Sequence, residues 1–280
     1  MNPKGKLLII GGHEDRDGTD VKMEEKNSEF ISHEILKLLT SDNNRRIEVI
    51  TTASSEPESM RDTYQKTFDE IGYTNFGFMH ILPEQADEDL DRLKNAGVIF
   101  FTGGDQNTLC KALKDTQANK LLIEKYQNEE DFLIAGTSAG AMCMPEIIID
   151  EGEEGEAMLK GDIKLGLGLN LLPRCIVDTH FIHRGRFGRL SHAVIIRQDC
   201  VGIGLGEDTA LLIENGHRAT CKGSGMTVII DPKNISRTNI ERVEKGDPVF
   251  AENLVVHLYT DGCSFDLRQD EEGAPDGGYH

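Results

Sequence analysis

A serine stands in a turn of small residues, a setting that suits a nucleophile. Residues 131–142 begin as an apolar run, reach Gly136-Thr137-Ser138-Ala139-Gly140 and continue with small residues that can start a helix. This order predicts a buried strand, a tight turn and a helix with Ser138 at the apex, the arrangement called a nucleophile elbow. Small neighbours are needed because such a turn strains the backbone of its apical residue. We interpret Ser138 as a nucleophile, although a glycine-rich connection with an ordinary serine shares the pattern.

A serine hydroxyl reacts only when a base takes its proton and an acid orients that base. His180 is the best candidate base because it follows an apolar segment and is expected at the same sheet edge as Ser138. His183 is a rival in the same segment. Glu207 lies in a polar turn between two apolar segments and is the candidate orienting acid. Asp178 is too near His180 in sequence, and on the opposite face of an extended segment, to orient it.

The oxyanion formed by an attacking serine needs hydrogen-bond donors. The backbone N–H of Ala139, directly after the nucleophile, is one candidate. A glycine pair, Gly103 and Gly104, follows the apolar segment 97–101, and glycines let a backbone approach a ligand closely. We therefore predict the second donor at Gly103 or Gly104.

Three arginines follow the candidate base within six positions, in a chain with an acidic excess. Arg184, Arg186 and Arg189 could form a solvated helix face, on which Arg186 and Arg189 would be neighbours. The alternative is a carboxylate-binding pocket, because the planar guanidinium holds carboxylates with two hydrogen bonds. Candidates for binding the other polar ends of a zwitterionic substrate are Asp105, Gln106 and Asp178.

Two charged loops have a functional and an ordinary interpretation. His13, Glu14 and Asp15 could hold a metal, but adjacent residues rarely converge on one ion, so we favour a solvated or supporting loop and predict no metal site. The acidic stretch 150–156 is interpreted as a mobile loop, either a flap that meets a basic substrate or a surface turn.

Strand and helix patterns alternate through the first half of the chain. Such alternation predicts an α/β fold with an open, mostly parallel sheet and helices on both faces. Functional sites in such sheets lie at the carboxyl ends of the strands, where Ser138 and Gly103 would meet. The expected strands are 6–10, 46–50, 76–82, 97–101 and the run before Ser138, and the expected helices are 30–39, 60–71, 87–95 and 109–125.

The second half contains further apolar segments. Residues 201–213 are interpreted as two strands around a polar turn, and Asn215-Gly216 is a hairpin signal. Strands are also expected at 226–230 and 254–259. We expect this part to extend the same sheet with an antiparallel end, so that 1–267 form one domain. The acidic, Gly-rich tail 268–280 is expected to be disordered.

Composition limits the possible partners and the compartment. The 280-residue chain has a net charge of −19, which argues against nucleic acids and anionic membranes as partners. No apolar run has the length of a membrane span. Its six cysteines are scattered without a C-x-x-C pair, as in a reducing compartment. We therefore expect a cytoplasmic protein.

Taken together and in order, five segments resemble the cyanophycinase family. These segments are 9–15, 101–106, 136–141, 178–190 and 204–210, and the resemblance extends from residue 6 to about 260. It implies a flavodoxin-like sheet related to class I glutamine amidotransferases, no cofactor, and a homodimer. It also implies Ser138 as nucleophile, His180 as base and Glu207 as orienting acid. The substrate pocket that it implies contains Gln106, Asp178, Thr179, Arg184, Arg186 and Arg189.

The resemblance implies a serine exopeptidase that degrades cyanophycin, a poly-aspartate with arginine on each side-chain carboxyl, to β-Asp-Arg dipeptides. The chain departs from the family at Thr179, where glutamine is typical, and at His13, where a small residue is common. The first departure bears on substrate preference. The alternatives are an α-aspartyl dipeptidase resembling peptidase E, and a non-catalytic binding protein of the same fold.

Overall fold

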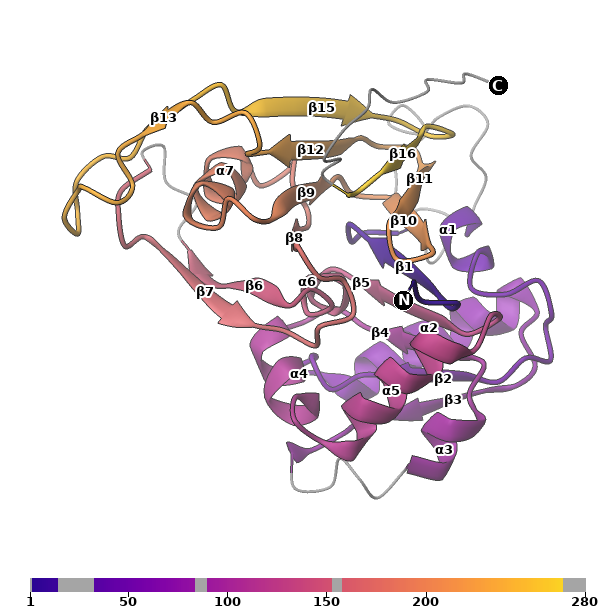
Figure 1. Cartoon of the computed structure of the whole chain (residues 1–280). Coiled ribbons are helices and arrows are strands. Elements are labelled where there is room, and N and C mark those ends of the chain that lie inside the picture. Colours follow the sequence, from indigo (N-terminus) through magenta and orange to yellow (C-terminus); the bar gives the residue numbers. More distant parts are fainter. Residues whose placement is uncertain (1, 15–32, 84–89, 153–157, 269–280) are drawn as a thin grey trace.

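A computed structural model describes residues 2–14, 33–83, 90–152 and 158–268 (Figure 1). Several expectations lie outside these residues: the tail from 269, the helix ends at 30–32 and 87–89, Asp15, and residues 153–156 of the acidic stretch. Within the described ranges, no helix is long and apolar enough to cross a membrane.

Five parallel strands form one side of the larger, eight-stranded sheet, in the order β1-β5-β4-β2-β3, with β3 at the edge. Every residue of β2 and β4 is buried, as expected for parallel strands covered on both faces. The predicted mostly parallel α/β sheet is thus confirmed. The strands are β1 (Lys6–Ile10), β2 (Ile47–Ile50), β3 (Phe76–Met79), β4 (Val98–Phe101) and β5 (Leu133–Thr137).

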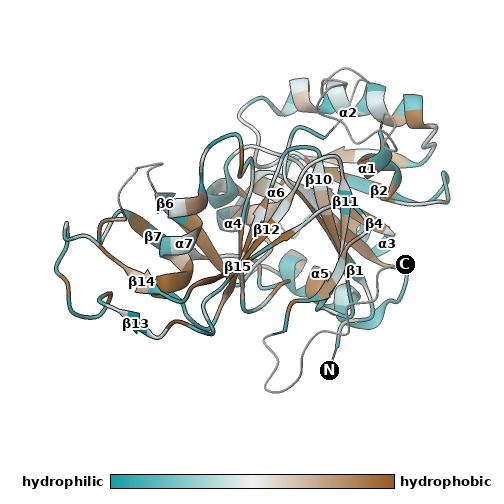
Figure 2. Ribbon diagram, turned by 90° about the horizontal axis from the view of Figure 1, so that it is seen from above, coloured by the Kyte–Doolittle hydropathy of each residue, from teal (hydrophilic) through white to brown (hydrophobic). Residues whose placement is uncertain are grey.

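Helices cover both faces of this sheet. Apolar side chains of α1 and α2 join one buried cluster, and those of α3 to α6 join the other. Figure 2 shows the hydrophobic strands enclosed between these layers. The helices are α1 (Glu34–Lys37), α2 (Pro57–Ile71), α3 (Leu90–Asn95), α4 (Gln106–Leu113), α5 (Gln117–Asn128) and α6 (Ala139–Met142).

The single helix expected at 109–125 is in fact two helices, α4 and α5. Asp115 has a φ of 64°, which a helix cannot contain. Thr116 then caps α5, because its hydroxyl accepts a hydrogen bond from the Asn119 N–H at 3.2 Å. The Asp-Thr pair is the sequence signal for this break.

Three antiparallel strands continue the sheet beyond β1, as predicted. β10 (Thr209–Glu214) pairs with β1, followed by β11 (Arg218–Gly223) and β16 (Ser264–Asp266). The predicted hairpin joins β10 to β11, with φ of 55° at Asn215 and 75° at Gly216. These angles are those of a two-residue turn that fits the twist of the strands.

A second sheet corrects the expectation that the whole second half extends the first. Its order is β15-β12-β9-β8, and α7 (Phe187–Ile196) connects the parallel pair β8 and β9. Although β9 and β10 are consecutive, they belong to different sheets, so the turn between them is a corner and not a hairpin. The strands are β8 (Cys175–Asp178), β9 (Val201–Leu205), β12 (Thr227–Asp231) and β15 (Val255–Tyr259).

Part of the acidic stretch is strand and not loop. Residues 150–152 belong to β6 (Ile147–Gly152), which pairs with β7 (Ile163–Leu167). This hairpin was not expected from the sequence. Asn107 Nδ2 fixes it by donating to the Asp150 carbonyl at 3.1 Å.

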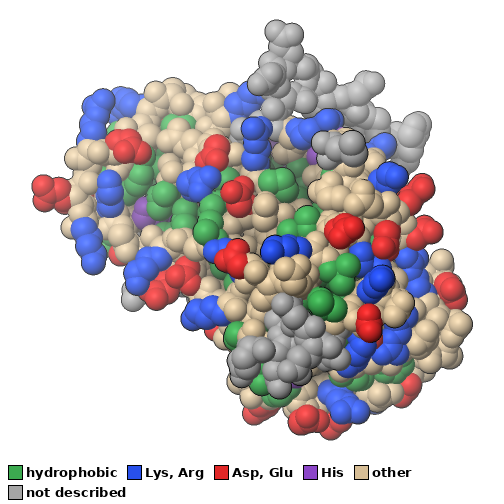
Figure 3. Space-filling model, turned by 60° about the horizontal axis from the view of Figure 1, so that its bottom comes forward, with side chains coloured by type: hydrophobic (Ala, Val, Ile, Leu, Met, Phe, Trp, Pro, Cys, Tyr) green, Lys and Arg blue, Asp and Glu red, His purple; other side chains and the backbone are tan. Residues whose placement is uncertain are grey.

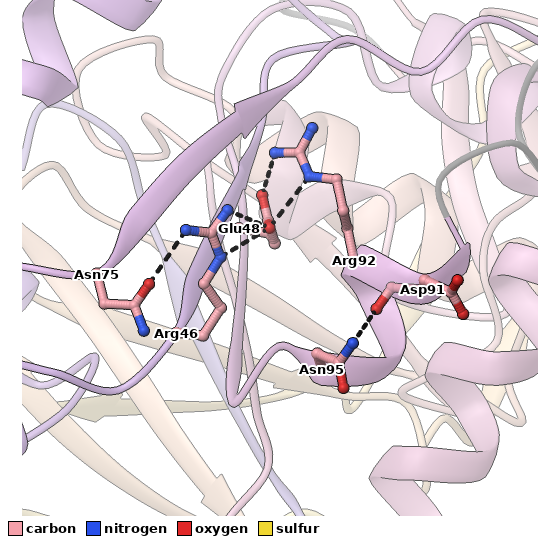
Figure 4. A pocket seen from close by; sticks show the side chains of 6 residues that line it. All are labelled: Arg46, Glu48, Asn75, Asp91, Arg92 and Asn95. Atoms are coloured by element: carbon pink, nitrogen blue, oxygen red, sulfur yellow. Dashed lines mark hydrogen bonds and ion pairs between the residues drawn. The ribbon is translucent and has the colours of Figure 1, made fainter.

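A cavity of about 440 Å³ lies near the amino ends of the strands, far from Ser138 (Figure 4). The Glu48 carboxylate is fully buried there. Arg46 Nε donates to it at 2.9 Å and Arg92 Nε at 3.2 Å. Acidic and basic side chains are also interspersed on the face shown in Figure 3. Because the buried carboxylate already pairs with both guanidinium groups, we assign this cluster a structural role.

Replacing Glu48→Gln removes the charge that both guanidinium groups share. We expect the free energy of unfolding to fall by about 2 kcal/mol, because each arginine keeps partial access to water. Urea denaturation measures this loss. The exposed residue Glu58 on α2 provides the control, since Glu58→Gln should change stability by less than about 0.5 kcal/mol. Equal stability of the two variants would contradict the structural role.

Candidate active site

Ser138 lies at the tip of a strained turn between β5 and α6. Its φ of 52° and ψ of −117° fall outside the regions that residues with a side chain favour. The turn packs so closely that a Cβ on Gly140 would lie 2.3 Å from the Phe101 carbonyl oxygen. The Ser138 N–H donates to the Ile10 carbonyl of β1 at 3.0 Å. These contacts hold the half-buried hydroxyl at the carboxyl edge of the sheet.

The His180 ring comes from the loop after β8 and reaches that hydroxyl. Its Nε2 lies 3.0 Å from Ser138 Oγ, within hydrogen-bond distance. The backbone N–H of His180 donates to the Gly11 carbonyl at 2.8 Å, which ties this loop to the end of β1. The ring also lies directly over Gly12, where an added Cβ would be 2.4 Å from Cε1.

Glu207 completes a hydrogen-bonded line of three side chains. Its Oε1 lies 2.7 Å from His180 Nδ1. The residue stands in the corner between β9 and β10, so the two sheets together place it. In this arrangement the imidazole can accept the serine proton while the carboxylate binds the other ring nitrogen. Serine enzymes activate their nucleophile with this geometry.

The surroundings set the pKa values of this pair. Burial lowers the pKa of His180, and the hydrogen bond with Glu207 opposes this by raising it, while the charge of Arg184 lowers it further. Burial also raises the pKa of Glu207, but its bond to His180 and the nearby charge of His13 outweigh burial and hold that pKa below its ordinary value. His180 is therefore neutral and Glu207 ionised at neutral pH, the states that the reaction needs.

The predicted oxyanion residues lie in two different settings. A Cβ on Gly103 would lie 3.5 Å from Ser138 Cβ, so this glycine adjoins the nucleophile. Ala139 begins α6 directly after it. Gly104 packs against the loop after β2, because a Cβ there would lie 1.9 Å from the Ala53 carbonyl oxygen. The role of oxyanion donor stays a prediction for Gly103, Gly104 and Ala139.

Asp178, Arg186 and Arg189, three of the predicted binding residues, contact one another in a cluster with little exposure, and their contact with substrate stays a prediction. The Asp178 side chain is fully buried. It accepts from Arg186 Nη1 at 3.0 Å and from Arg189 Nε at 2.8 Å. Arg186 Nη1 also donates to the Thr179 carbonyl at 2.8 Å. The cluster braces the loop that carries His180 against α7.

The other predicted binding residues differ in exposure. Thr179 is fully buried, and its hydroxyl contacts Met142 Sδ at 3.2 Å, so it does not face the site in this structure. Asp105 caps α4 by accepting from the Asn107 N–H. Gln106 Nε2 donates to the Ile149 carbonyl at 3.1 Å and is half-buried. Arg184 is exposed. Direct substrate contact stays a prediction for Gln106 and Arg184.

The sequence places Glu14 in a charged loop, but only 2% of the residue is exposed. Thr137 Oγ1 donates to its Oε2 at 2.5 Å, and the Tyr64 hydroxyl donates to Oε1. Glu14 thereby joins the loop after β1 to the residue before Ser138. Among the residues that the structure describes, no group of three or more potential ligands could hold a metal.

A cavity of about 370 Å³ adjoins the Glu207 end of the line. Its walls combine imidazole, hydroxyl and apolar groups from the corner and its neighbouring loops. They include His13, Ile182, His183, Glu207, Ser224 and Met226.

Comparison with known proteins gives a consistent result. Residues 17–221 match the family described as Peptidase family S51. A cyanophycinase of Trichormus variabilis is 32% identical over 272 residues, covering 95% of this chain and 87% of the relative. A cyanophycinase of Synechococcus elongatus is 34% identical over 226 residues, covering 79% of this chain and 70% of the relative.

Two solved structures share the fold. A peptidase from an acI-B1 Actinobacterium has a TM-score of 0.66 at 21% identity, covering 95% of this chain and 98% of that one. A putative peptidase E protein from Listeria monocytogenes EGD-e has a TM-score of 0.53 at 18% identity, covering 78% of this chain and 98% of that one.

The contact between Gly12 and the His180 ring predicts that Gly12→Ala disables the site. The methyl group must displace the ring from Ser138 Oγ, so we expect kcat/KM to fall at least about 100-fold. Gly246→Ala is a matched control, because both glycines have a φ of 93° but no atom lies within 4 Å of a Cβ at Gly246. Similar activity of the two variants would contradict this arrangement.

The lowered pKa of His180 predicts the pH dependence of hydrolysis. The imidazole accepts a proton only when neutral, so kcat/KM should fall as pH drops through this pKa. We expect the midpoint of that acid limb below the ordinary value of about 6.5. Glu207→Gln removes a group that raises the pKa of His180, so the limb should move to still lower pH while the rate falls about 10²- to 10⁴-fold. A limb above the ordinary value would contradict the assignment.

Proposed function

The chain belongs to peptidase family S51 and is a serine-type peptidase, and from this premise we propose that it is an exopeptidase that hydrolyses cyanophycin to β-Asp-Arg dipeptides. The observation that carries the proposal is the hydrogen-bonded line from Ser138 through His180 to Glu207, with separations of 3.0 and 2.7 Å. The relatives named cyanophycinase give the substrate class.

In the proposed reaction, Ser138 Oγ attacks the carbonyl carbon of an α-peptide bond in the aspartate backbone. His180 takes the hydroxyl proton and then gives it to the leaving nitrogen. Glu207 holds the imidazole in the required orientation and stabilises its charge. Water then hydrolyses the acyl-enzyme with His180 again as base. The N–H groups of Gly103 and Ala139 are the proposed donors to the oxyanion.

We assign substrate recognition to only one of the three arginines that follow His180. Arg186 and Arg189 are occupied by Asp178. Exposed Arg184, whose charge reaches His180, is then the proposed contact for a substrate carboxylate.

A second candidate function is an α-aspartyl dipeptidase. Its support is the fold shared with the putative peptidase E protein from Listeria monocytogenes. The cyanophycinase relatives, which cover more of this chain, favour the polymer as substrate.

We further propose a cytoplasmic homodimer. All six cysteines are free, and burial raises the pKa of Cys175 to about 12, as for inert structural thiols of a reducing compartment. The dimer follows only from the family resemblance. No cofactor is part of the proposed reaction.

The test is incubation of the purified protein with cyanophycin and, separately, with α-Asp dipeptides, with products identified by mass spectrometry. We expect β-Asp-Arg from the polymer and no cleavage of the dipeptides. Ser138→Ala should abolish product formation. Cleavage of dipeptides alone would select the second candidate, and hydrolysis that survives in Ser138→Ala would refute the assigned nucleophile.

A further inference from the structure

The Glu207 carboxylate lies between two histidines of one loop. Oε1 lies 2.7 Å from His180 Nδ1, and Oε2 lies 3.3 Å from His183 Nδ1. His180 is almost fully buried, whereas 58% of the His183 side chain is exposed. The histidine that the sequence offered as a rival base is therefore on the far side of the acid from the nucleophile.

Glu207 needs a second restraint because of where it stands. It borders the 370 Å³ cavity beside the corner of the two sheets, and 19% of its side chain is exposed. The terminal torsion of a glutamate is broad, so a carboxylate held at one oxygen can rotate into the cavity. Such rotation would take Oε1 away from His180 Nδ1 and leave the imidazole without its orienting partner.

Other charged groups near Glu207 do not provide this restraint. His13 meets the His180 ring edge-on, with ring centroids 5.6 Å apart, and influences Glu207 only through its charge. Asp208 accepts a hydrogen bond from the Ser224 hydroxyl, and Arg184 acts on His180 through its charge. Within the described part of the chain, His183 makes the only ion-pair contact with Oε2.

We propose that His183 is a positioning residue that holds the outer oxygen of Glu207, so that the inner oxygen stays on His180 throughout the reaction. This rests on the proposed function of the triad. His183 can donate from Nδ1 either as imidazolium or as the neutral tautomer that carries hydrogen there. The restraint therefore persists on the pH plateau of activity.

Two variants separate the contact with Glu207 Oε2 from the rest of the His183 side chain. In His183→Ala the donor is lost, and we expect the plateau kcat to fall about tenfold while KM changes less than about twofold, because the effect is on the base and not on binding. In His183→Asn the side-chain amide can donate from about the position of Nδ1, so kcat should recover to within about threefold of the wild type. The melting temperature should be the same in both, since the side chain is exposed.

His257→Ala is the matched control, because His257 is an exposed histidine on β15 that stacks on the Tyr259 ring. It should have wild-type kcat. If His183→Ala retained wild-type kcat, or if His183→Asn were as slow as His183→Ala, the proposal would be overturned.

A double-mutant cycle tests whether His183 acts through Glu207. In a Glu207→Ala background, His183→Ala should cause less than about a twofold further loss, because the group it positions is gone. A further tenfold loss there would overturn the proposal. If the proposed triad were wrong, Ser138→Ala would retain activity, with His183 either present or replaced. That outcome differs from every outcome that concerns His183 alone.

Discussion

The end of β1 and the two glycines that follow it are the point on which the whole site depends. The Ile10 carbonyl binds the Ser138 N–H, the Gly11 carbonyl binds the His180 N–H, and the Gly12 carbonyl binds the Asp208 N–H, at 3.0, 2.8 and 3.0 Å. Three loops that are far apart in sequence thus dock on three consecutive carbonyl groups. Because backbone hydrogen bonds fix both distance and direction, these three contacts bring the Ser138, His180 and Glu207 side chains within reach of one another.

Two buried carboxylates, Glu14 and Asp178, hold the loops that meet at this junction. Glu14 fastens the loop after β1 to Thr137, and Asp178 fastens the His180 loop to two arginines. A buried carboxylate is tolerated only when its oxygens are satisfied, and both carboxylates meet this condition with several donors. In this structure Asp178, Arg186 and Arg189 therefore hold the loop that carries His180.

The sequence predicted the elements whose signals are local. The elbow around Ser138, the parallel strands and the Asn215-Gly216 turn each depend on a few adjacent residues, and the structure has all three. The second sheet could not be predicted, because residues 175–205 have the same strand-helix-strand pattern whichever sheet they join. The buried state of Asp178 was also missed. Its position at the end of an apolar strand, with two arginines three residues apart at the start of the next helix, is the signal that could have indicated it.

The position of the acid in the corner between the sheets has a consequence for synthesis. The ribosome synthesises Ser138 42 residues before His180, and Glu207 follows 27 residues after His180. A nascent chain can therefore shape its elbow on β1 and β5 while the hydroxyl still lacks both partners. The hydrogen-bonded line from Ser138 to Glu207 can therefore form only after residue 207 has been synthesised and the corner between the two sheets has folded.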